Sequence, residues 1–258
     1  MPGFESLHLG ILLWVVAVIA FAGWVQGALG LGFPMVATPL IAAVTDMRTA
    51  VIVVVVPCIA CVATNVAKTG SLRPVLARFW AMPLYMVLGA AAGTQLFISF
   101  PRFPYALMLA GMILFYLGLE RLGRTDWPLL KSHPAPFGAL CGVIAGAVEG
   151  TANIAAPPLV IYYLALGVAP VVLVQGLNIC FLTGKTTQFA TLAIAGGVDA
   201  MQWFATLPLA LVACVTVVYG IRVRNRIDAG TYRTWLKRAL FAMALVLVTQ
   251  YAWLAARA

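Results

Sequence analysis

Lys185 is the one basic residue inside a long apolar run of the chain, from 171 to 195. If this run is a helix, polar residues three or four positions apart share one face with Lys185. An ionisable side chain within an apolar span indicates a functional site, and a cation beside hydrogen-bond donors suits an anion. The alternative is that Lys185 extends to the outer membrane interface. The polar residues on the face are Gln175, Asn178 and Gln188, of which Asn178 and Gln188 join Lys185 as predicted anion ligands.

Glu149 is the single acidic residue that falls at mid-membrane depth. It has two possible roles: an ion pair with Lys185, or a protonatable group that couples transport to an ion gradient. An ionised, unpaired Glu149 would repel an anion. The hypothesis of an anion site therefore requires that Glu149 be protonated or paired.

Two interruptions of the apolar pattern carry further candidates. The first contains Gly30, Gly32 and Phe33, and the second contains Thr151 and Asn153. Glycines let backbone N–H groups converge, and the N-terminus of a following helix is a natural seat for a carboxylate or sulfonate. Thr151 and Asn153 are N-cap residue types, so they either cap the second such helix or also bind the anion. Gln26, just before the first interruption, is a weaker candidate of the same kind.

The composition excludes a water-soluble fold. Of the 258 residues, 64% are hydrophobic and 9% charged, against about 25% charged in a soluble domain. Cys58 and Cys61 have CxxC spacing but lie in an apolar helix, where packing is their expected role. His8 and His133 are too far apart to suggest a metal cluster. We expect no catalytic residues, no cofactor, no metal site and no nucleic-acid partner.

The apolar runs predict an all-α polytopic membrane protein made of two inverted repeats. Each repeat is a re-entrant helical hairpin followed by three transmembrane helices, with the two hairpin tips meeting at one central site. The first repeat covers 1–124, with its hairpin at 7–45 and spans at 49–67, 79–100 and 104–119. A cytoplasmic linker covers 125–135, and the second repeat covers 136–258, with its hairpin at 137–167 and spans at 171–195, 200–221 and 236–255. A shift of 119 residues superimposes Gly23 on Gly142 and Gly27 on Gly146, pairs that we expect to serve close helix packing.

Basic residues set the expected orientation. With hairpins, twelve basic residues between 68 and 238 share one side, and Arg48, Arg102 and Arg257 lie on the other. The positive-inside rule makes the richer side cytoplasmic. Both termini are then periplasmic, in a bacterial inner membrane. Two full crossings per broken segment, ten spans in all, would give the same sides.

The residues around both interruptions resemble the TauE/SafE family of sulfite-exporter-like membrane transporters. The first stretch runs from Val25 to Leu40, and the second combines 142–146 with Ala156 to Tyr163. The chain departs from the family's glycine-rich second signature at Glu149, Thr151 and Asn153. The resemblance implies transport of small anions such as sulfur oxyanions, organosulfonates or short carboxylates.

These expectations combine into a secondary transporter of a small anion that works by alternating access and is coupled to protons or sodium. The alternatives are an anion channel, or an intramembrane enzyme or assembly factor. The basic loop from Arg222 to Arg226 is expected to contact anionic membrane lipid. The sequence leaves the oligomeric state open.

Overall fold

The structure is a computed structural model that describes residues 9–100, 128–195 and 198–226. Beyond 226 it describes only positions 228, 230, 231, 234, 235, 238, 241, 242, 245 and 249. The predicted span at 104–119 lies outside the described residues, as does most of the predicted span at 236–255. Every regular element among the described residues is a helix.

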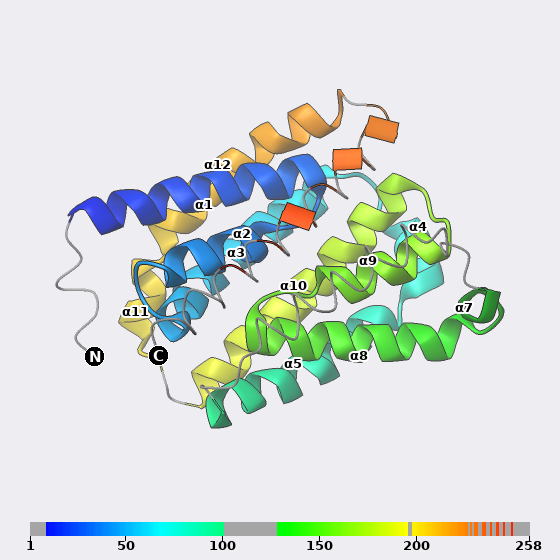
Figure 1. Cartoon of the computed structure of the whole chain (residues 1–258), viewed down its shortest axis with the longest axis horizontal. Coiled ribbons are helices and arrows are strands. Elements are labelled where there is room, and N and C mark those ends of the chain that lie inside the picture. The colour runs from blue at the N-terminus through cyan, green and yellow to red at the C-terminus, as the bar shows by residue number, and fades with distance from the viewer. Residues whose placement is uncertain are drawn as a thin grey trace.

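The helices fall into two groups along the chain (Figure 1). The first group contains α1 (Leu9–Leu29), α2 (Phe33–Ala42), α3 (Met47–Lys68), α4 (Arg73–Phe79) and α5 (Met82–Ser99). After the short α7 (Pro128–Ser132), the second contains α8 (Pro134–Ala152), α9 (Ala156–Ala165), α10 (Pro170–Ile194), α11 (Ala200–Ala205) and α12 (Leu207–Arg224). The predicted span at 79–100 is thus α5 alone, because residues 80–81 separate it from α4.

Helix lengths support a membrane-embedded fold. Four single helices, α1, α3, α5 and α8, and the segment Ala200–Arg224 are long and apolar enough to cross a membrane. By contrast, α2 and α9 have 10 residues each, about 15 Å at 1.5 Å per residue, which is half of a bilayer core of roughly 30 Å. As single helices, α2 and α9 are too short for a full crossing.

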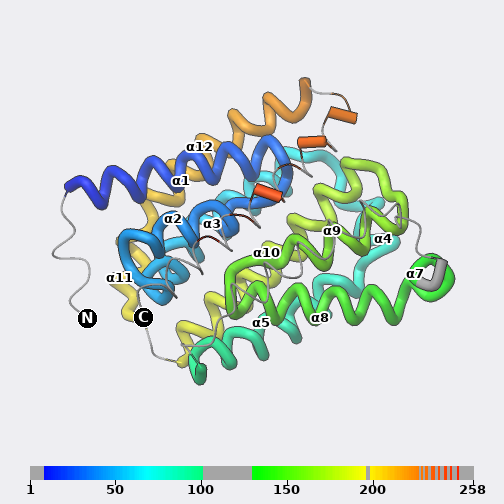
Figure 2. The backbone as a smooth tube through the Cα atoms, viewed as in Figure 1, coloured from blue at the N-terminus to red at the C-terminus, as the bar shows by residue number. Residues whose placement is uncertain are grey.

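Three helix boundaries of the second group follow those of the first by 123 positions. Helix α2 begins at 33 and α9 at 156; α3 begins at 47 and α10 at 170; α1 ends at 29 and α8 at 152. The offset of 119 taken from the sequence is therefore wrong by four positions, because glycines that pack in both halves matched without being structurally equivalent. Figure 2 shows the chain turning back on itself after α1 and again after α8.

Equivalent helices run in opposite directions in Figure 1. Helix α1 starts at the end of the molecule marked by α11, whereas α8 starts at the opposite end, beside α7. Likewise α3 runs towards α4, whereas α10 runs towards α11. Helices α3 and α10 contact each other at the centre of the molecule.

Packing divides the helices into two bundles that do not coincide with the two groups along the chain. Helices α1, α2 and α3 pack with α12, and this set is called the first bundle. Helices α8, α9 and α10 pack with α5 and are called the second bundle. Helix α5 of the first group thus packs in the second bundle, and α12 of the second group packs in the first bundle. Among the described helices, the principal contact between bundles is α3 against α10.

Glycines bring the exchanged helices into backbone contact. A Cβ at Gly27 of α1 would lie 2.1 Å from the carbonyl oxygen of Val217 in α12. A Cβ at Gly146 of α8 would lie 2.4 Å from the carbonyl oxygen of Met86 in α5. The predicted packing role of these glycines is confirmed, and their partners are α12 and α5, helices of the opposite groups.

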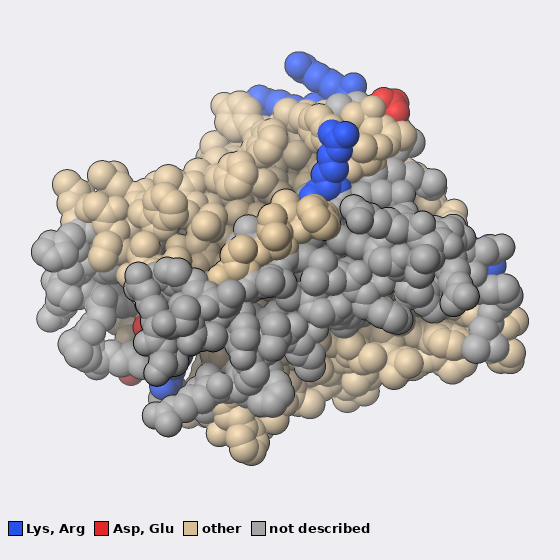
Figure 3. Space-filling model, in the orientation of Figure 1, with Lys and Arg blue, Asp and Glu red and all other residues tan. Residues whose placement is uncertain are grey.

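Basic side chains mark one end of the molecule. Figure 3 shows Lys and Arg gathered beside the C-terminal end of α12, where Arg222, Arg224 and Arg226 lie. Lys68 ends α3 at this end, and Arg48 lies in the first turn of α3, at the opposite end.

Candidate functional site

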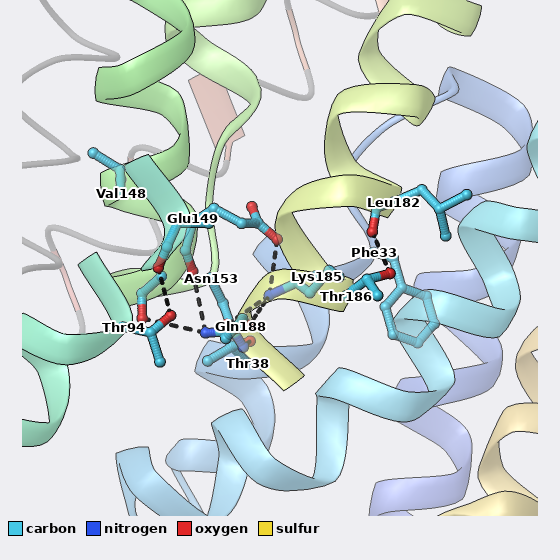
Figure 4. Close-up of polar contacts among 12 residues, drawn as sticks. Phe33, Thr38, Thr94, Val148, Glu149, Asn153, Leu182, Lys185, Thr186 and Gln188 are labelled. Atoms are coloured by element: carbon cyan, nitrogen blue, oxygen red, sulfur yellow. Dashed lines mark hydrogen bonds and ion pairs between the residues drawn. The ribbon is translucent and has the colours of Figure 1, made fainter. Parts of the chain in front are cut away.

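Lys185 is buried in the middle of the helix packing, where its ammonium group meets three oxygen atoms (Figure 4). Its Nζ donates to Asn153 Oδ1 at 2.6 Å and to Gln188 Oε1 at 2.8 Å. Glu149 Oε1 lies 2.8 Å from the same nitrogen in an ion pair. A lysine has three N–H donors, so each has a protein acceptor here. Because the exposed fraction of Lys185 is 0%, the alternative of extension to the interface is wrong.

Glu149 lies in the last turn of α8, with an exposed fraction of 1%. The expected pairing with Lys185 is present. The second carboxylate oxygen, Oε2, is buried and accepts no hydrogen bond from the described residues. Two buried opposite charges need close contact to offset their desolvation, and the distance of 2.8 Å to Oε1 provides it. This pair is the one ion pair buried among the described residues.

Asn153 ends α8 in the left-handed conformation, with φ 60° and ψ 29°. Asparagine tolerates this conformation better than most residues because its short side chain bonds locally. Here Oδ1 accepts from Lys185 and, at 2.9 Å, from Gln188 Nε2. The backbone turn therefore places the amide of Asn153 against α10.

The predicted capping role of Thr151 and Asn153 is wrong. Helix α8 continues to Ala152, and the N-cap of α9 is Ala155, which makes no side-chain cap bond. Thr151 instead donates its hydroxyl to the carbonyl oxygen of Ala147 at 2.9 Å, within α8. The last turn of α8 packs closely against the backbone of α5 at Gly150, and this contact accompanies the helical residues beyond the predicted break.

Gln188 and Thr38 complete the group of residues around Lys185. Gln188 Nε2 also donates to the carbonyl oxygens of Glu149 and Gly150, at 3.2 and 3.3 Å. Asn153 Nδ2 donates to Thr38 Oγ1 of α2 at 3.1 Å. Thr38 was not among the predicted residues, because nothing in its local sequence indicates a contact 115 positions away. The residues of this charged network are Thr38, Glu149, Asn153, Lys185 and Gln188.

A second network, which is neutral, surrounds the break between α1 and α2. Gln26 Nε2 donates to Asn178 Oδ1 at 2.8 Å, and Gln26 Oε1 accepts from the backbone N–H of Phe33 at 3.0 Å. Asn178 Nδ2 donates to the carbonyl oxygen of Gly30 at 2.8 Å. Asn65 Nδ2 donates to Asn178 Oδ1 and to the carbonyl oxygen of Gln26. Of the predicted residues, Gly32 has the positive φ of 111° that precedes α2 and makes no side-chain contact.

The two networks occupy equivalent places at the offset of 123. Gln26 corresponds to Glu149, Gly30 to Asn153, and Asn65 to Gln188. Gly30 and Asn153 both have left-handed φ angles, 75° and 60°. Asn65 Nδ2 and Gln188 Nε2 both donate to the carbonyl oxygen of the equivalent first residue, at 3.1 and 3.2 Å. The offset of 123 would have pointed to Asn65 from the sequence. The buried ion pair of Lys185 and Glu149, however, belongs to the charged network alone.

The networks do not form the single central site that we expected. Asn178 and Lys185 are seven residues apart on α10, about 10 Å at 1.5 Å per residue. The break after α1 therefore contacts α10 nearer its start, and the break after α8 contacts α10 nearer its end. Both networks nevertheless join the two bundles, through Asn178 in one case and Thr38 in the other.

Polar contacts also connect the helices at the basic end of the molecule. Arg224 of α12 donates to Asn65 Oδ1 at 3.1 Å and to Thr69 Oγ1 at 2.8 Å. Gln175 Nε2 of α10 donates to the carbonyl oxygen of Gly70 at 2.8 Å. Arg224, which the sequence indicated only as part of a basic loop, thus reaches the neutral network.

The described residues hold no group of three or more His, Cys, Asp or Glu side chains close enough for a metal ion. Cys58 and Cys61 are buried free thiols in α3, as expected for packing residues. What the geometry offers is a buried cation, its carboxylate partner and two amides at a broken helix. Such a group can bind a small anion without covalent chemistry.

Comparison with known proteins identifies one family. Neither a curated protein nor a solved structure matches the chain. The family model described as Sulfite exporter TauE/SafE matches residues 15–250, nearly the whole chain. The chain, with its apolar helices and buried charged network, therefore belongs to the TauE/SafE sulfite exporter family.

Proposed function

We propose that this protein is a secondary transporter that binds a small anion at Lys185 and moves it across the membrane by alternating access. The observation that carries the proposal is the fully buried ammonium group of Lys185 on α10, which contacts Asn153 at the break after α8. Intramembrane cations are costly and are kept where they bind a substrate or a counter-charge. Candidate substrates are sulfur oxyanions, organosulfonates and short carboxylates.

The charged network supplies the donors that an oxyanion needs. Lys185 contributes three N–H donors, and the side-chain amide nitrogens of Asn153 and Gln188 are further donors in the same network, bonded here to Thr38 Oγ1 and to Asn153 Oδ1. Charge-assisted hydrogen bonds of this kind are stronger than neutral ones. Low polarity around the site strengthens them further, because buried charges are poorly screened.

Alternating access follows from the arrangement of the bundles. The opposite directions of α1 and α8, and of α3 and α10, support an inverted repeat. We infer that the first and second bundles move against each other along the α3–α10 contact. A transporter is favoured over a channel because all three N–H donors of Lys185 are engaged by protein oxygens, so an anion enters only by displacing one of them.

The basic end of the molecule indicates orientation. We infer that the end with Lys68 and the last turn of α12 is cytoplasmic, in a bacterial inner membrane, and that both termini are periplasmic. Membership of an exporter family supports transport over the alternative of an intramembrane enzyme.

The direct test is a thermal-shift screen of the purified full chain in detergent against sulfite, sulfate, thiosulfate, isethionate, sulfoacetate, taurine and acetate. A ligand that binds the folded state raises the Tm by mass action. We expect at least one anion to raise the Tm of the wild type and to leave that of Lys185→Gln unchanged. Lys68→Gln, the same substitution at an exposed lysine of α3, is the control and should respond as the wild type does.

Two results would contradict the proposal. One is an equal response of Lys185→Gln and the wild type, which would place the anion elsewhere. The other is no response to any anion at any pH between 5 and 8. Saturable uptake into proteoliposomes, set against uptake that grows linearly with anion concentration, then separates a transporter from a channel.

A further inference from the structure

The charged network shows how transport would be coupled, an inference that rests on the proposed function. We propose that Glu149 is the proton-binding site of a proton–anion cotransporter, in which its carboxylate and the transported anion bind to Lys185 in turn. In the structure, the carboxylate of Glu149 is bound to Lys185 where the substrate anion would otherwise bind.

The geometry makes the two anions exclusive. Lys185 Nζ has three N–H donors and three oxygen neighbours, at 2.6 to 2.8 Å. Two of these neighbours are neutral amide oxygens, and one is a carboxylate oxygen. An incoming anion replaces the carboxylate of Glu149, because both are negatively charged and compete for the same ammonium group. A released and ionised Glu149 would then stand unpaired in a buried site, at a cost of several kcal/mol.

A proton removes this obstacle. When Glu149 is ionised, the pair of Lys185 and Glu149 has zero net charge. When Glu149 takes up one proton and Lys185 binds a singly charged anion, the net charge of the site is again zero. The proton comes from water and bonds to a carboxylate oxygen, and no other bond forms or breaks. The protein then carries one proton and one anion together, so proton binding and anion binding strengthen each other.

Glu149 Oε2 is placed to receive the proton. It is buried and accepts no hydrogen bond from the described part of the chain, so protonating it breaks no existing contact. A sodium ion at Glu149 would lie beside the ammonium group of Lys185, which is 2.8 Å from Oε1, and it would share the carbonyl oxygens of Glu149 and Gly150 with Gln188. Asn153 Oδ1 likewise accepts from Lys185 and Gln188. The site therefore favours a proton over sodium as the coupling ion.

Few other groups near Glu149 titrate. The other ionisable residues on its own helix and on the described helices packed around it are Cys141 on α8, Lys185 and Cys180 on α10, Tyr85 on α5, Tyr162 and Tyr163 on α9, and Arg48, Cys58, Cys61 and Lys68 on α3. Cys58 interacts electrostatically with both Lys185 and Glu149. Its thiol is fully buried among apolar side chains. Glu149 is thus the one carboxylate among these groups.

The charge balance also selects the substrate. A singly charged anion leaves the occupied site neutral, whereas a doubly charged anion leaves one uncompensated negative charge in a low-polarity interior. We therefore expect sulfonates, monocarboxylates and hydrogensulfite to bind, and sulfate to bind at least a hundredfold more weakly.

Isothermal titration with isethionate tests the coupling, because this sulfonate keeps a single charge over the whole pH range used. With wild-type protein we expect uptake of one proton per isethionate bound, read from the dependence of the heat on the ionisation enthalpy of the buffer. The affinity should rise tenfold for each unit of falling pH while Glu149 is ionised in the empty protein. This measurement needs no variant, so it stands even if a substitution prevents folding.

Glu149→Gln is the matched variant. The equivalent position of the first repeat carries Gln26, so glutamine is accommodated at this place in the fold. We expect the variant to bind isethionate tightly and with no dependence on pH from 5 to 8, and to exchange isethionate across a liposome without moving protons. Asp199→Asn, an exposed acid at the start of α11, is the control and should keep the wild-type pH dependence.

The outcomes separate the coupling from the function. Binding that depends on Lys185 but takes up no proton would overturn the coupling and leave the anion site intact. Uptake into proteoliposomes that follows an imposed membrane potential rather than a pH gradient would overturn it as well, because the proposed cycle moves no net charge. Failure of every anion to bind would instead remove the proposed function itself.

Discussion

The side-chain amides of Gln26 and Asn178 lie 2.8 Å apart, although 152 positions separate them in the chain. Gln26 belongs to α1 in the first bundle, and Asn178 belongs to α10 in the second. Asn65 donates to the same Asn178 oxygen at 3.2 Å. Asn178 of the second bundle therefore bonds to two helices of the first bundle, α1 and α3.

Replacing this asparagine should loosen the contact. Asn178→Leu removes the acceptor of Gln26 and Asn65 and the donor to the carbonyl oxygen of Gly30. Leaving buried polar groups unpaired costs about 1–3 kcal/mol each, so we expect a clearly lower Tm in detergent. Thr186→Ala is the control on the same helix, because its exposed hydroxyl bonds only within α10, to the carbonyl oxygen of Leu182. Equal Tm values for the two variants would show that the neutral network does not stabilise the fold.

Gly27 tests the backbone contact between α1 and α12. In Gly27→Ala the new Cβ would lie 2.1 Å from the carbonyl oxygen of Val217, so the helices must separate. Overpacking of this kind costs about 1–3 kcal/mol, and we expect a lower Tm and poorer yield of folded protein. Gly10→Ala in the same helix meets nothing within 4 Å and should leave the Tm unchanged or raise it. A tolerated Gly27→Ala would contradict the close packing.

Much of the architecture could be predicted from composition and spacing. The long apolar runs located α1, α3, α8 and α10 to within a few residues, and the polar spacing along 175–188 correctly indicated one buried face. The end of α8 could not be predicted, because it depends on packing against α5 and on the left-handed turn at Asn153. Local residue preferences favoured an earlier break, and tertiary contacts decided otherwise.

Asn153 allows backbone strain to be separated from side-chain contacts. Asn153→Gly keeps the left-handed turn but removes the oxygen that accepts from Lys185 and Gln188. Asn153→Ala removes the same oxygen but keeps a Cβ at φ 60°, which costs about 1–2 kcal/mol relative to the glycine variant. We expect both variants to bind isethionate about tenfold more weakly, from the loss of roughly one hydrogen bond, and the alanine variant to have the lower Tm. Equal Tm values would show that the turn is not strained.

Accessibility to a membrane-impermeant maleimide tests the orientation. Val44 lies in the exposed loop after α2, and Ser71 lies in the exposed loop after α3, at the other end of that helix. We expect Val44→Cys to be labelled in intact cells and Ser71→Cys only after the inner membrane is opened. The reverse pattern would invert the proposed topology, and labelling of both in intact cells would contradict a single crossing by α3. The unsubstituted protein measures the background from its five native cysteines.

The contacts within the site were less predictable than its principal residues. Lys185 and Glu149 stand out as charges in apolar surroundings, so their pairing could be expected. Thr38 could not be, since its contact with Asn153 depends on how two distant broken helices pack beside each other. The four-residue error in the repeat offset hid the equivalence of Asn65 and Gln188, because glycine matches report helix packing and not the positions of polar side chains.

The exchange of long helices between bundles constrains the order in which the protein is built. During synthesis α1 is made well before α12, the helix against which Gly23 and Gly27 pack. Gly23 and Gly27 therefore lack their partner helix until about 200 further residues have been added. Helix α5 waits for α8 over a shorter stretch of chain. The second bundle can consequently assemble before the first, and the N-terminal helix is among the last to take its final place.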